Sequence, residues 1–553
     1  MDFWDKQRQK IQLRRASLAA IALLACIVFV YQSFQEPSDS SSSSSWFSFH
    51  SPGRTRHEAA SAISGNDSTR SKPAIELVSQ ATSSSIPPPQ LLPGSPPPVP
   101  SQELGQGGGD ELPLLPPSIA PSPTQEISLP KKNLTQERSD FNASALANLD
   151  RKVVRKREIP QWRVILEQDL RRAKQEIKVA GPRNTQLDPQ ATRSIYLNAY
   201  KFHKSYELME RLFKVYVYKE GEPRLVHKGP LTGIYSSEGR FIHEMNQNSR
   251  FVTHDPQEAH MFFLPYSVAH MVLDLYVPGS HTMLPLATFI KDYVNLIASK
   301  HPFWNLTRGS DHFFTSCHDW GPATARDHPE LRKNSVKVVC NSDLTEEFVP
   351  DKDASLPETY LHAVKLPTKL GGPGPSKRPI LAFFAGQMHG RVRPALIKHW
   401  KDRGDPDMRI YEVLPPEVAR RTSYVQHMKS SKFCICAMGF EVNSPRIVES
   451  IYYDCVPVLI ADNFVLPFSD VLNWGSFSLT VSEKDVPRLK ELLLAVSEDR
   501  YRKMQSRLKK VRKHFLWHDS AERFDMFHMI LHSVWTRRLQ QMDAIIGHET
   551  SMV

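Results

Sequence analysis

From about residue 193 onward, the chain alternates between short apolar runs and longer amphipathic segments. The apolar runs are rich in β-branched and aromatic residues, as strands are, whereas the amphipathic segments have the period of helices. In the first half we predict strands at 213–218, 261–265, 312–317 and 336–340, and a helix at 284–299. Strands that alternate with helices form parallel sheets covered by helices. The alternation therefore predicts an α/β fold.

A break rich in glycine and proline, residues 370–379, interrupts this alternation. After the break we predict strands at 380–385, 409–414, 433–437 and 456–460, and helices at 392–400, 416–430, 445–453, 484–514 and 524–537. Because the same pattern stands on both sides of the break, we predict two Rossmann-like lobes that face a cleft. The first lobe spans residues 193–370 and the second spans residues 371–545.

Residues 36–150 have the composition of a disordered stem. Seventeen of the 43 prolines fall between Pro37 and Pro130, and serines fill positions 40–45. Such a segment buries too little apolar area to offset the loss of chain entropy. Residues 151–192 are charged instead, and apolar residues recur there at spacings of three and four (Trp162, Leu166, Leu170, Ala173 and Ile177). They predict a helical stem or neck, which either joins a neighbouring helix or lies on the lobes.

An uncharged stretch, residues 16–35, follows a basic tail at residues 1–15. Twenty residues in a helix span about 30 Å, the thickness of a bilayer core. The basic flank places the tail in the cytoplasm and the rest in a lumen, as in a type II membrane protein with a signal anchor. A cleaved signal peptide is the alternative, but bulky Tyr31 and Phe34 stand where a small-residue cleavage site is expected.

The formal net charge of +11 permits an anionic partner. Nucleic acid is one such partner, but zinc-finger spacings, RNP-like strands and basic zippers are missing from the sequence. We expect a diffusely basic surface and no nucleic-acid partner. In a lumen, four sequons predict N-glycosylation, at Asn66, Asn133, Asn142 and Asn305.

The segment from 431 to 468 reads as strand, loop, helix, strand. Ser444 is a predicted N-cap, and Pro445 suits the first helical turn. Such a helix start offers free N–H groups to a diphosphate, and Arg446 adds a charged fork. Glu449 either accepts hydrogen bonds from ribose hydroxyls or pairs locally with Arg446.

This segment resembles the exostosin family, glycosyltransferase family 47, and especially its plant branch. Further matching motifs are FKVYVY at 213–218, AHMFFLPYS at 259–267, GSDHFF at 309–314, FFAGQMHGRVRP at 383–394, VLNW at 471–474 and HFLWH at 514–518. The resemblance covers about residues 195–540. It implies a GT-B architecture and an inverting transfer from a UDP-sugar or similar donor without a metal cofactor. It also implies a Golgi enzyme that extends a polysaccharide or glycan, with plant cell-wall polysaccharides as the expected products.

With the donor in the second lobe, we expect its diphosphate on two segments: the turn after strand 380–385, through Gly386, Arg391 and Arg393, and the helix start at 444–446. The alternative for Arg391 and Arg393 is that they lie in a solvent-exposed basic turn and bind no ligand. For the general base, the stretch GSDHFFTSCHDW offers Asp311, His312, His318 and Asp319. A structural histidine is the alternative for His312.

Metal-dependent transfer is not expected. The two D-x-D triplets, 351–353 and 405–407, do not end apolar strands, and we predict that both are surface turns. Cys434 and Cys455 flank the helix 445–453, so we predict a disulfide between them, and a second between Cys317 and Cys340.

Two other functions share parts of this pattern. A Golgi sulfotransferase has a similar anchor, stem and basic cleft, but needs a phosphosulfate loop that the sequence lacks. A non-catalytic scaffolding subunit of a glycosyltransferase complex keeps the fold without turnover. Further copies of this chain, or other Golgi glycosyltransferases, are possible oligomeric partners.

Overall fold

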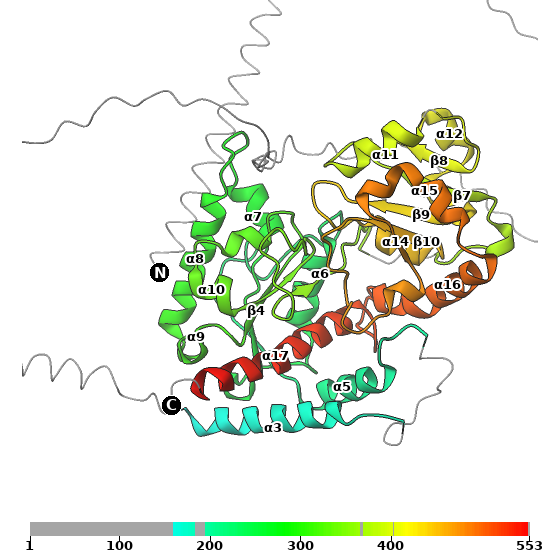
Figure 1. The fold of residues 1–553 in the computed structure, drawn as a ribbon. Coiled ribbons are helices and arrows are strands. Elements are labelled where there is room, and N and C mark those ends of the chain that lie inside the picture. Colours follow the sequence, from blue (N-terminus) through cyan, green and yellow to red (C-terminus); the bar gives the residue numbers. More distant parts are fainter. Residues whose placement is uncertain (1–158, 183–193, 365–368, 402, 551–553) are drawn as a thin grey trace, which may run out of the picture. The chain divides into compact units, whose positions relative to one another are not determined.

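A computed structural model describes residues 159–182, 194–364, 369–401 and 403–550. It contains two parallel sheets with helices packed around them (Figure 1). The predicted cytoplasmic tail, membrane span and disordered stem lie outside these residues. Among the described helices, none combines the length and apolar character needed to cross a bilayer.

The first sheet has six strands in the order β2-β1-β3-β4-β5-β6, all parallel. The strands are β1 (Val215–Val217), β2 (Val252–Thr253), β3 (Met261–Phe263), β4 (His312–Ser316), β5 (Val336–Val339) and β6 (Ala354–Ser355). The helices between them are α5 (Ala199–Leu212), α6 (Ser236–Gln247), α7 (Val268–Leu275), α8 (Leu284–Lys300), α9 (Pro302–Thr307) and α10 (Pro329–Asn334). Every residue of β3, β4 and β5 is buried, as expected of parallel strands covered on both faces.

The second sheet has five parallel strands in the order β11-β10-β9-β7-β8. The strands are β7 (Ile380–Ala385), β8 (Met408–Tyr411), β9 (Ser431–Ala437), β10 (Val456–Ile460) and β11 (Leu479–Thr480). The helices are α11 (Val392–Trp400), α12 (Pro416–Arg421), α13 (Tyr424–Ser430), α14 (Arg446–Tyr452), α15 (Leu489–Leu494) and α16 (Glu498–Val511). From β7 the chain adds β8 on one side and then crosses to add β9 on the other, so the strand order reverses between β7 and β9.

The sequence prediction locates the long strands of both sheets but misses β2, β6 and β11. Each of these has two residues and lies at the edge of its sheet, so none carries a readable alternation. The predicted helix at 416–430 is wrong in one respect, because the structure divides it into α12 and α13. Ser423 caps α13 and forms a reciprocal capping box with Gln426, which begins a new helix there.

Two helices from opposite ends of the described chain pack together (Figure 1). The predicted neck helix is α3 (Gln161–Lys178), which packs against α5 and α17 and so lies on the folded part. The C-terminal helix α17 (Met526–Thr550) also packs against β5 and β6. The first part of α17 falls within the predicted second lobe, 371–545, and contacts its 3-10 helix η6 (Arg512–Phe515) as well as β5 and β6 of the first sheet.

Two disulfides are present, Cys317–Cys340 and Cys434–Cys455, and these are the two pairs expected from the sequence. The first connects the residues that directly follow β4 and β5. The second connects β9 to the residue before β10. Cys436 remains a buried free thiol in β9.

Candidate functional site

The reversal of strand order between β7 and β9 creates a crevice at the carboxyl ends of these strands, where ligands bind in open α/β sheets. Two loops leave the sheet at this point, one after Ala385 and one after Ala437. Gly390 and Gly439 bring the loops into contact, since a Cβ on Gly390 would lie 1.8 Å from the Gly439 carbonyl oxygen. Gly390 also has φ +66°, which favours glycine.

Arg446 lies across the end of β7. Its Nε and Nη2 donate to the carbonyl oxygen of Ala385 at 3.1 and 2.7 Å, and its guanidinium lies over the Phe384 ring at 5.1 Å. A Cβ on Gly386 would lie 2.3 Å from Arg446 Nη2, so glycine is required for this approach. The predicted donor-site residues Gly386 and Arg446 are thus brought together, with Gly386 making room for the guanidinium.

Arg393 lies beside Arg446. It is buried in the first turn of α11, and its Nε and Nη1 donate to the carbonyl oxygens of Ala437 and Gln387, both at 3.3 Å. Burial, and then the charge of Arg446, lower the pKa of Arg393 to about 9. Within the described residues, neither guanidinium has a carboxylate within 4.0 Å. Two neighbouring cations that donate only to uncharged oxygen atoms form a site suited to an anion.

Three carboxyl groups lie near this arginine pair: Asp319, Glu358 and Glu441. Glu358 and Glu441 are buried close to each other, and the Oε2 atom of each has no hydrogen-bond partner among the described residues. Burial, with the charge of Asp319 next, raises the pKa of both glutamates. Burial therefore favours the protonated, neutral form of both side chains. Neither glutamate was predicted from the sequence, because each stands alone in a loop without a recognisable spacing.

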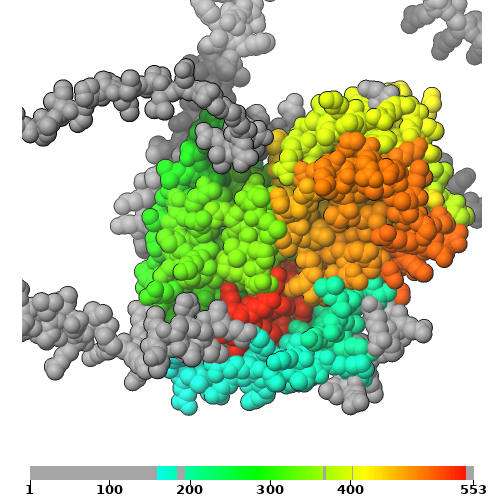
Figure 2. All heavy atoms as spheres, viewed as in Figure 1, coloured from blue at the N-terminus to red at the C-terminus, as the bar shows by residue number. Residues whose placement is uncertain are grey.

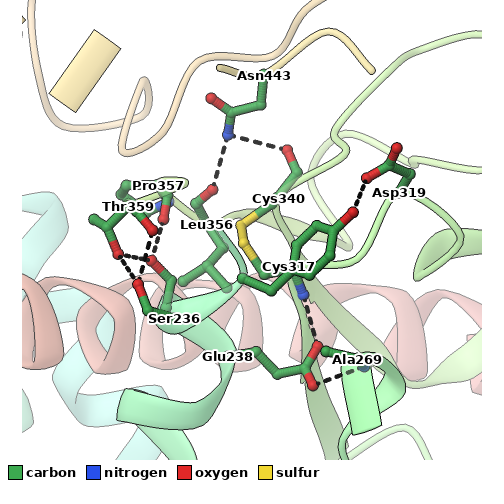
Figure 3. The surroundings of a disulfide bond; sticks show 12 residues. Ser236, Glu238, Ala269, Cys317, Asp319, Cys340, Leu356, Pro357, Thr359 and Asn443 are labelled. Carbon is green, nitrogen blue, oxygen red and sulfur yellow. Dashed lines mark hydrogen bonds between the residues drawn. A yellow bond between two sulfur atoms is a disulfide. The ribbon is translucent and has the colours of Figure 1, made fainter. Parts of the chain in front are cut away.

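Asn443 connects the loop that leads into α14 with the loops that follow β5 and β6 (Figure 3). Its Nδ2 donates to the carbonyl oxygens of Cys340 and Leu356 at 3.1 and 3.2 Å, and its Oδ1 accepts from the backbone N–H of Ser444 at 2.8 Å. The loop that leads into α14 is thereby fixed to the carboxyl ends of β5 and β6. Asn443 was not among the predicted site residues, although it directly precedes the predicted donor-site residues 444–446.

The predicted N-cap is wrong. Helix α14 begins at Arg446, Pro445 occupies the cap position, and no side chain caps the helix. Ser444 is held differently, because its Oγ accepts from Arg446 Nη1 at 3.2 Å. Ser444 and Pro445 still lie at the crevice, where they position the arginine.

Glu449 is hydrogen-bonded to Tyr424, whose hydroxyl donates to its Oε2 at 2.9 Å. Burial raises the pKa of Glu449, against the opposing effects of Arg446 and Tyr424. No ion pair within 4.0 Å joins Glu449 to Arg446 in the described structure. The role of Glu449 in binding ribose stays a prediction.

Arg391 does not fit its predicted role at the diphosphate. Its exposed guanidinium makes a two-pronged ion pair with Glu483, at 2.6 and 2.7 Å, on the flank of the second sheet. The charge of Arg391 is therefore already paired, unlike those of Arg393 and Arg446.

The predicted bases Asp311 and His312 do not fit a catalytic role either. Asp311 is 1% exposed and accepts from Arg163 at 2.5 Å and from Thr307 at 2.6 Å. His312 lies 2.7 Å from Asp311 and 2.8 Å from the hydroxyl of Tyr218. Burial would raise the pKa of Asp311, but Arg163 and then His312 outweigh it and hold that pKa well below its usual range. These residues lie at the amino end of β4 and form a saturated structural network.

Asp319, in contrast, lies beyond the carboxyl end of β4, next to the disulfide Cys317–Cys340 (Figure 3). Its Oδ1 accepts from the hydroxyl of Tyr235 at 3.0 Å. His318 is buried, packs against the Tyr235 ring and has a pKa lowered by burial. Of the predicted bases, Asp319 is the carboxylate that lies beside Glu358, Glu441 and the arginine pair.

The described residues contain no group of three or more His, Cys, Asp or Glu arranged to hold a metal ion. The D-x-D triplet at 351–353 lies in a turn as predicted, with Asp351 exposed, but Asp353 is fully buried and pairs with Lys337 and Lys352. Asp405 of the other triplet pairs with Lys490.

Of the predicted sequons, Asn66, Asn133 and Asn142 lie outside the described residues. Asn305 is exposed in α9, and its side-chain amide donates to the carbonyl oxygen of Ala298 at 2.7 Å. Its glycosylation stays a prediction.

Comparison with known proteins gives consistent matches. Residues 209–496 match the Exostosin GT47 domain. "Probable glycosyltransferase At5g03795" of Arabidopsis thaliana is 45% identical over 471 residues, which cover 84% of this chain and 89% of that protein. "Probable glycosyltransferase At5g25310" of the same plant is 47% identical over 387 residues, 68% of this chain and 79% of that protein. "Probable beta-1,4-xylosyltransferase IRX10", also from Arabidopsis, is 28% identical over 344 residues, 58% and 81% respectively.

Proposed function

Because the chain belongs to the exostosin GT47 family of glycosyltransferases, we propose that it transfers a sugar from a nucleoside diphosphate sugar to a polysaccharide acceptor. The lobes correspond to a GT-B enzyme, with the donor bound by the second sheet. The expected products are cell-wall polysaccharides, since relatives named as xylosyltransferase and glucuronosyltransferase belong to plants.

The observation that carries this proposal is the adjacent, unneutralised pair Arg393 and Arg446 at the reversal of strand order. A diphosphate supplies the negative charge that both guanidiniums lack, and arginine forms two-pronged hydrogen bonds to phosphate oxygens. The same charges stabilise the diphosphate as it leaves. Because the arginines supply this charge, the reaction needs no divalent metal.

The proposed chemistry is a direct displacement with inversion at the anomeric carbon. The acceptor oxygen forms a bond to this carbon as the bond to the diphosphate oxygen breaks. Asp319 takes the proton of the acceptor hydroxyl, and the negative charge leaves with the diphosphate.

The proposed location is the Golgi lumen, with residues 16–35 as a type II membrane anchor. The proposal rests on the uncharged span and the basic tail in the sequence. Protease protection of the folded part in sealed microsomes, and its loss on adding detergent, would test this orientation.

The function is tested with the detergent-solubilised full chain, a panel of UDP-sugars and excess EDTA. We expect binding of one donor, and its slow hydrolysis or transfer, without added metal. Restoration of turnover only by Mn²⁺ or Mg²⁺ would contradict the metal-independent mechanism. If folded protein binds no donor, the non-catalytic scaffolding function replaces the proposed one.

A further inference from the structure

Four ring side chains form a continuous series in the first lobe: Tyr276, Trp320, His318 and Tyr235. We refer to them as the aromatic strip. The ring centroids of Tyr276 and Trp320 lie 4.8 Å apart, those of Trp320 and His318 5.1 Å, and those of His318 and Tyr235 4.7 Å. The strip draws on three segments: the end of α7, the loop after β4 and the start of α6. Its rings therefore come together only in the folded lobe.

The aromatic strip leads directly to the proposed base. Trp320 is the next residue after Asp319, and the hydroxyl of Tyr235 donates to the Asp319 carboxylate at 3.0 Å. A ligand that lies along the strip thus ends at the carboxylate that would take the acceptor proton. The strip also stays on the acceptor side, because it lies entirely in the first lobe and the arginine pair lies in the second.

Ordinary core packing is the alternative explanation for such a series of rings. The rings around His312 show what core packing looks like in the same lobe, since Tyr218, Phe262 and His312 stack on one another and are fully buried. In the aromatic strip, Tyr235, Tyr276 and Trp320 are only half-buried. Exposed Leu273 and Val277 extend the apolar surface beside Tyr276. The strip therefore retains ring surface that the described residues do not cover.

The charges near the strip restrict what can lie on it. Asp319 stands at its end, and Glu346 lies close by, held by the Asn341 amide at 2.9 Å. Burial, and then the charges of Asp343 and Asp319, raise the pKa of Glu346 against the opposing effect of the Asn341 hydrogen bond. Burial keeps His318 neutral, so it offers no positive charge to offset these acids. The arginine pair also lies near Asp319, but a bound diphosphate compensates its charge. With the donor bound, a uronic-acid chain would therefore be repelled here, whereas a neutral glycan would not.

We propose that the aromatic strip binds consecutive sugar rings of a neutral, extended glycan acceptor and directs its terminal hydroxyl to Asp319. Sugar rings present C–H groups on their faces, and these carry partial positive charge toward the negative faces of aromatic rings. Sites of this kind combine an aromatic lining with few polar groups that fix orientation. The inference rests on the proposed function, because it assigns the acceptor side of the same site.

The test measures binding of xylohexaose, cellohexaose and hexagalacturonate to the detergent-solubilised full chain, with and without UDP. We expect at least one neutral hexamer to bind and hexagalacturonate to bind more weakly. Saturation transferred from aromatic protons should reach the C–H protons of the bound sugar. In Trp320→Ala we expect the Kd for the neutral hexamer to rise at least tenfold while the Kd for UDP stays unchanged.

Trp162→Ala is the matched control. Trp162 is also half-buried and contacts one ring, that of Phe303 at 6.1 Å, but it lies on α3 near the amino end of β4. Hexamer binding should be unchanged in this variant. Unchanged hexamer binding in Trp320→Ala, tighter binding of hexagalacturonate, or failure of wild type to bind either neutral hexamer would each overturn the inference. Loss of UDP binding alone would instead contradict the donor site and leave the strip assignment standing.

Discussion

Strand β4 has a cluster of charged and polar side chains at each end, and the two clusters differ in how their hydrogen bonds are satisfied. At the amino end, Asp311 accepts from Arg163, Thr307 and His312, so its negative charge is fully compensated. Beyond the carboxyl end, Glu358 and Glu441 each retain an oxygen atom without a partner among the described residues. Similar residue types thus serve different purposes at the two ends.

The difference shows how to tell a structural charge from a functional one. The amino-end cluster joins α3 to the sheet through a buried ion pair, and a ligand would have nothing to add to it. The carboxyl-end cluster, together with Arg393 and Arg446, holds charges that the protein leaves uncompensated. Buried polar groups without partners are costly, so their presence indicates that a ligand supplies what is missing.

The largest effect is expected from breaking the amino-end cluster. In Arg163→Ala, Asp311 would remain buried without its cation, and the free energy of unfolding should fall by about 3–5 kcal/mol. Denaturant unfolding of the full chain measures this loss. The double variant Arg163→Met, Asp311→Asn should recover much of it, because no charge is then left unpaired. A stable Arg163→Ala protein with weakened donor binding would reverse the roles assigned to the two ends.

The next effect concerns the arginine pair at the carboxyl end. Arg446→Ala should lower turnover of the donor sugar by roughly 10²–10³-fold, as for the loss of a donor that stabilises developing charge. Its stability should change little, since Arg446 donates only to Ala385 and Ser444. Arg391→Ala is the control and should retain most activity, because Arg391 is paired with Glu483. Equal losses in the two variants would show that general positive charge, and not the pair, binds the donor.

The smallest effect is a difference in pH dependence between the two ends. Folding lowers the pKa of Asp311. Its contribution to the free energy of unfolding is therefore present above the pKa of the unfolded state and is lost in acid. Folding raises the pKa values of Glu358 and Glu441. Their contribution to the free energy of unfolding is therefore largest in acid and is lost as the pH rises through the pKa values of the folded state. Glu441→Gln mimics the protonated form and should raise the free energy of unfolding on the order of 1 kcal/mol at pH 9 but not at pH 5. Thermal unfolding at both pH values measures this, and equal shifts at the two would contradict it.

The longer strands could be predicted from sequence because their apolar runs are bounded by polar turns. The two-residue edge strands could not, because pairing with a neighbour and not local pattern defines them. Gly386, Arg393 and Arg446 could be expected to lie close together because each follows a clear strand; that they bind the donor stays a prediction. Glu358 and Glu441 were missed because their proximity depends on how the two lobes meet. Asp311 was predicted as a candidate base. It lies before strand β4, however, whereas ligands of parallel sheets bind where the strands end.

Helix α17 has a consequence for how the protein is made. The first sheet emerges early in synthesis, yet the helix that covers β5 and β6 belongs to the last residues of the chain. Met526, Phe527, Ile530, Val534 and Trp535 all complete the buried core from this helix. The first lobe therefore cannot finish folding before this helix has been synthesised, and it depends on contacts between distant segments that form slowly. A premature stop before residue 526 would leave β5 and β6 without this helix and so destabilise the first lobe.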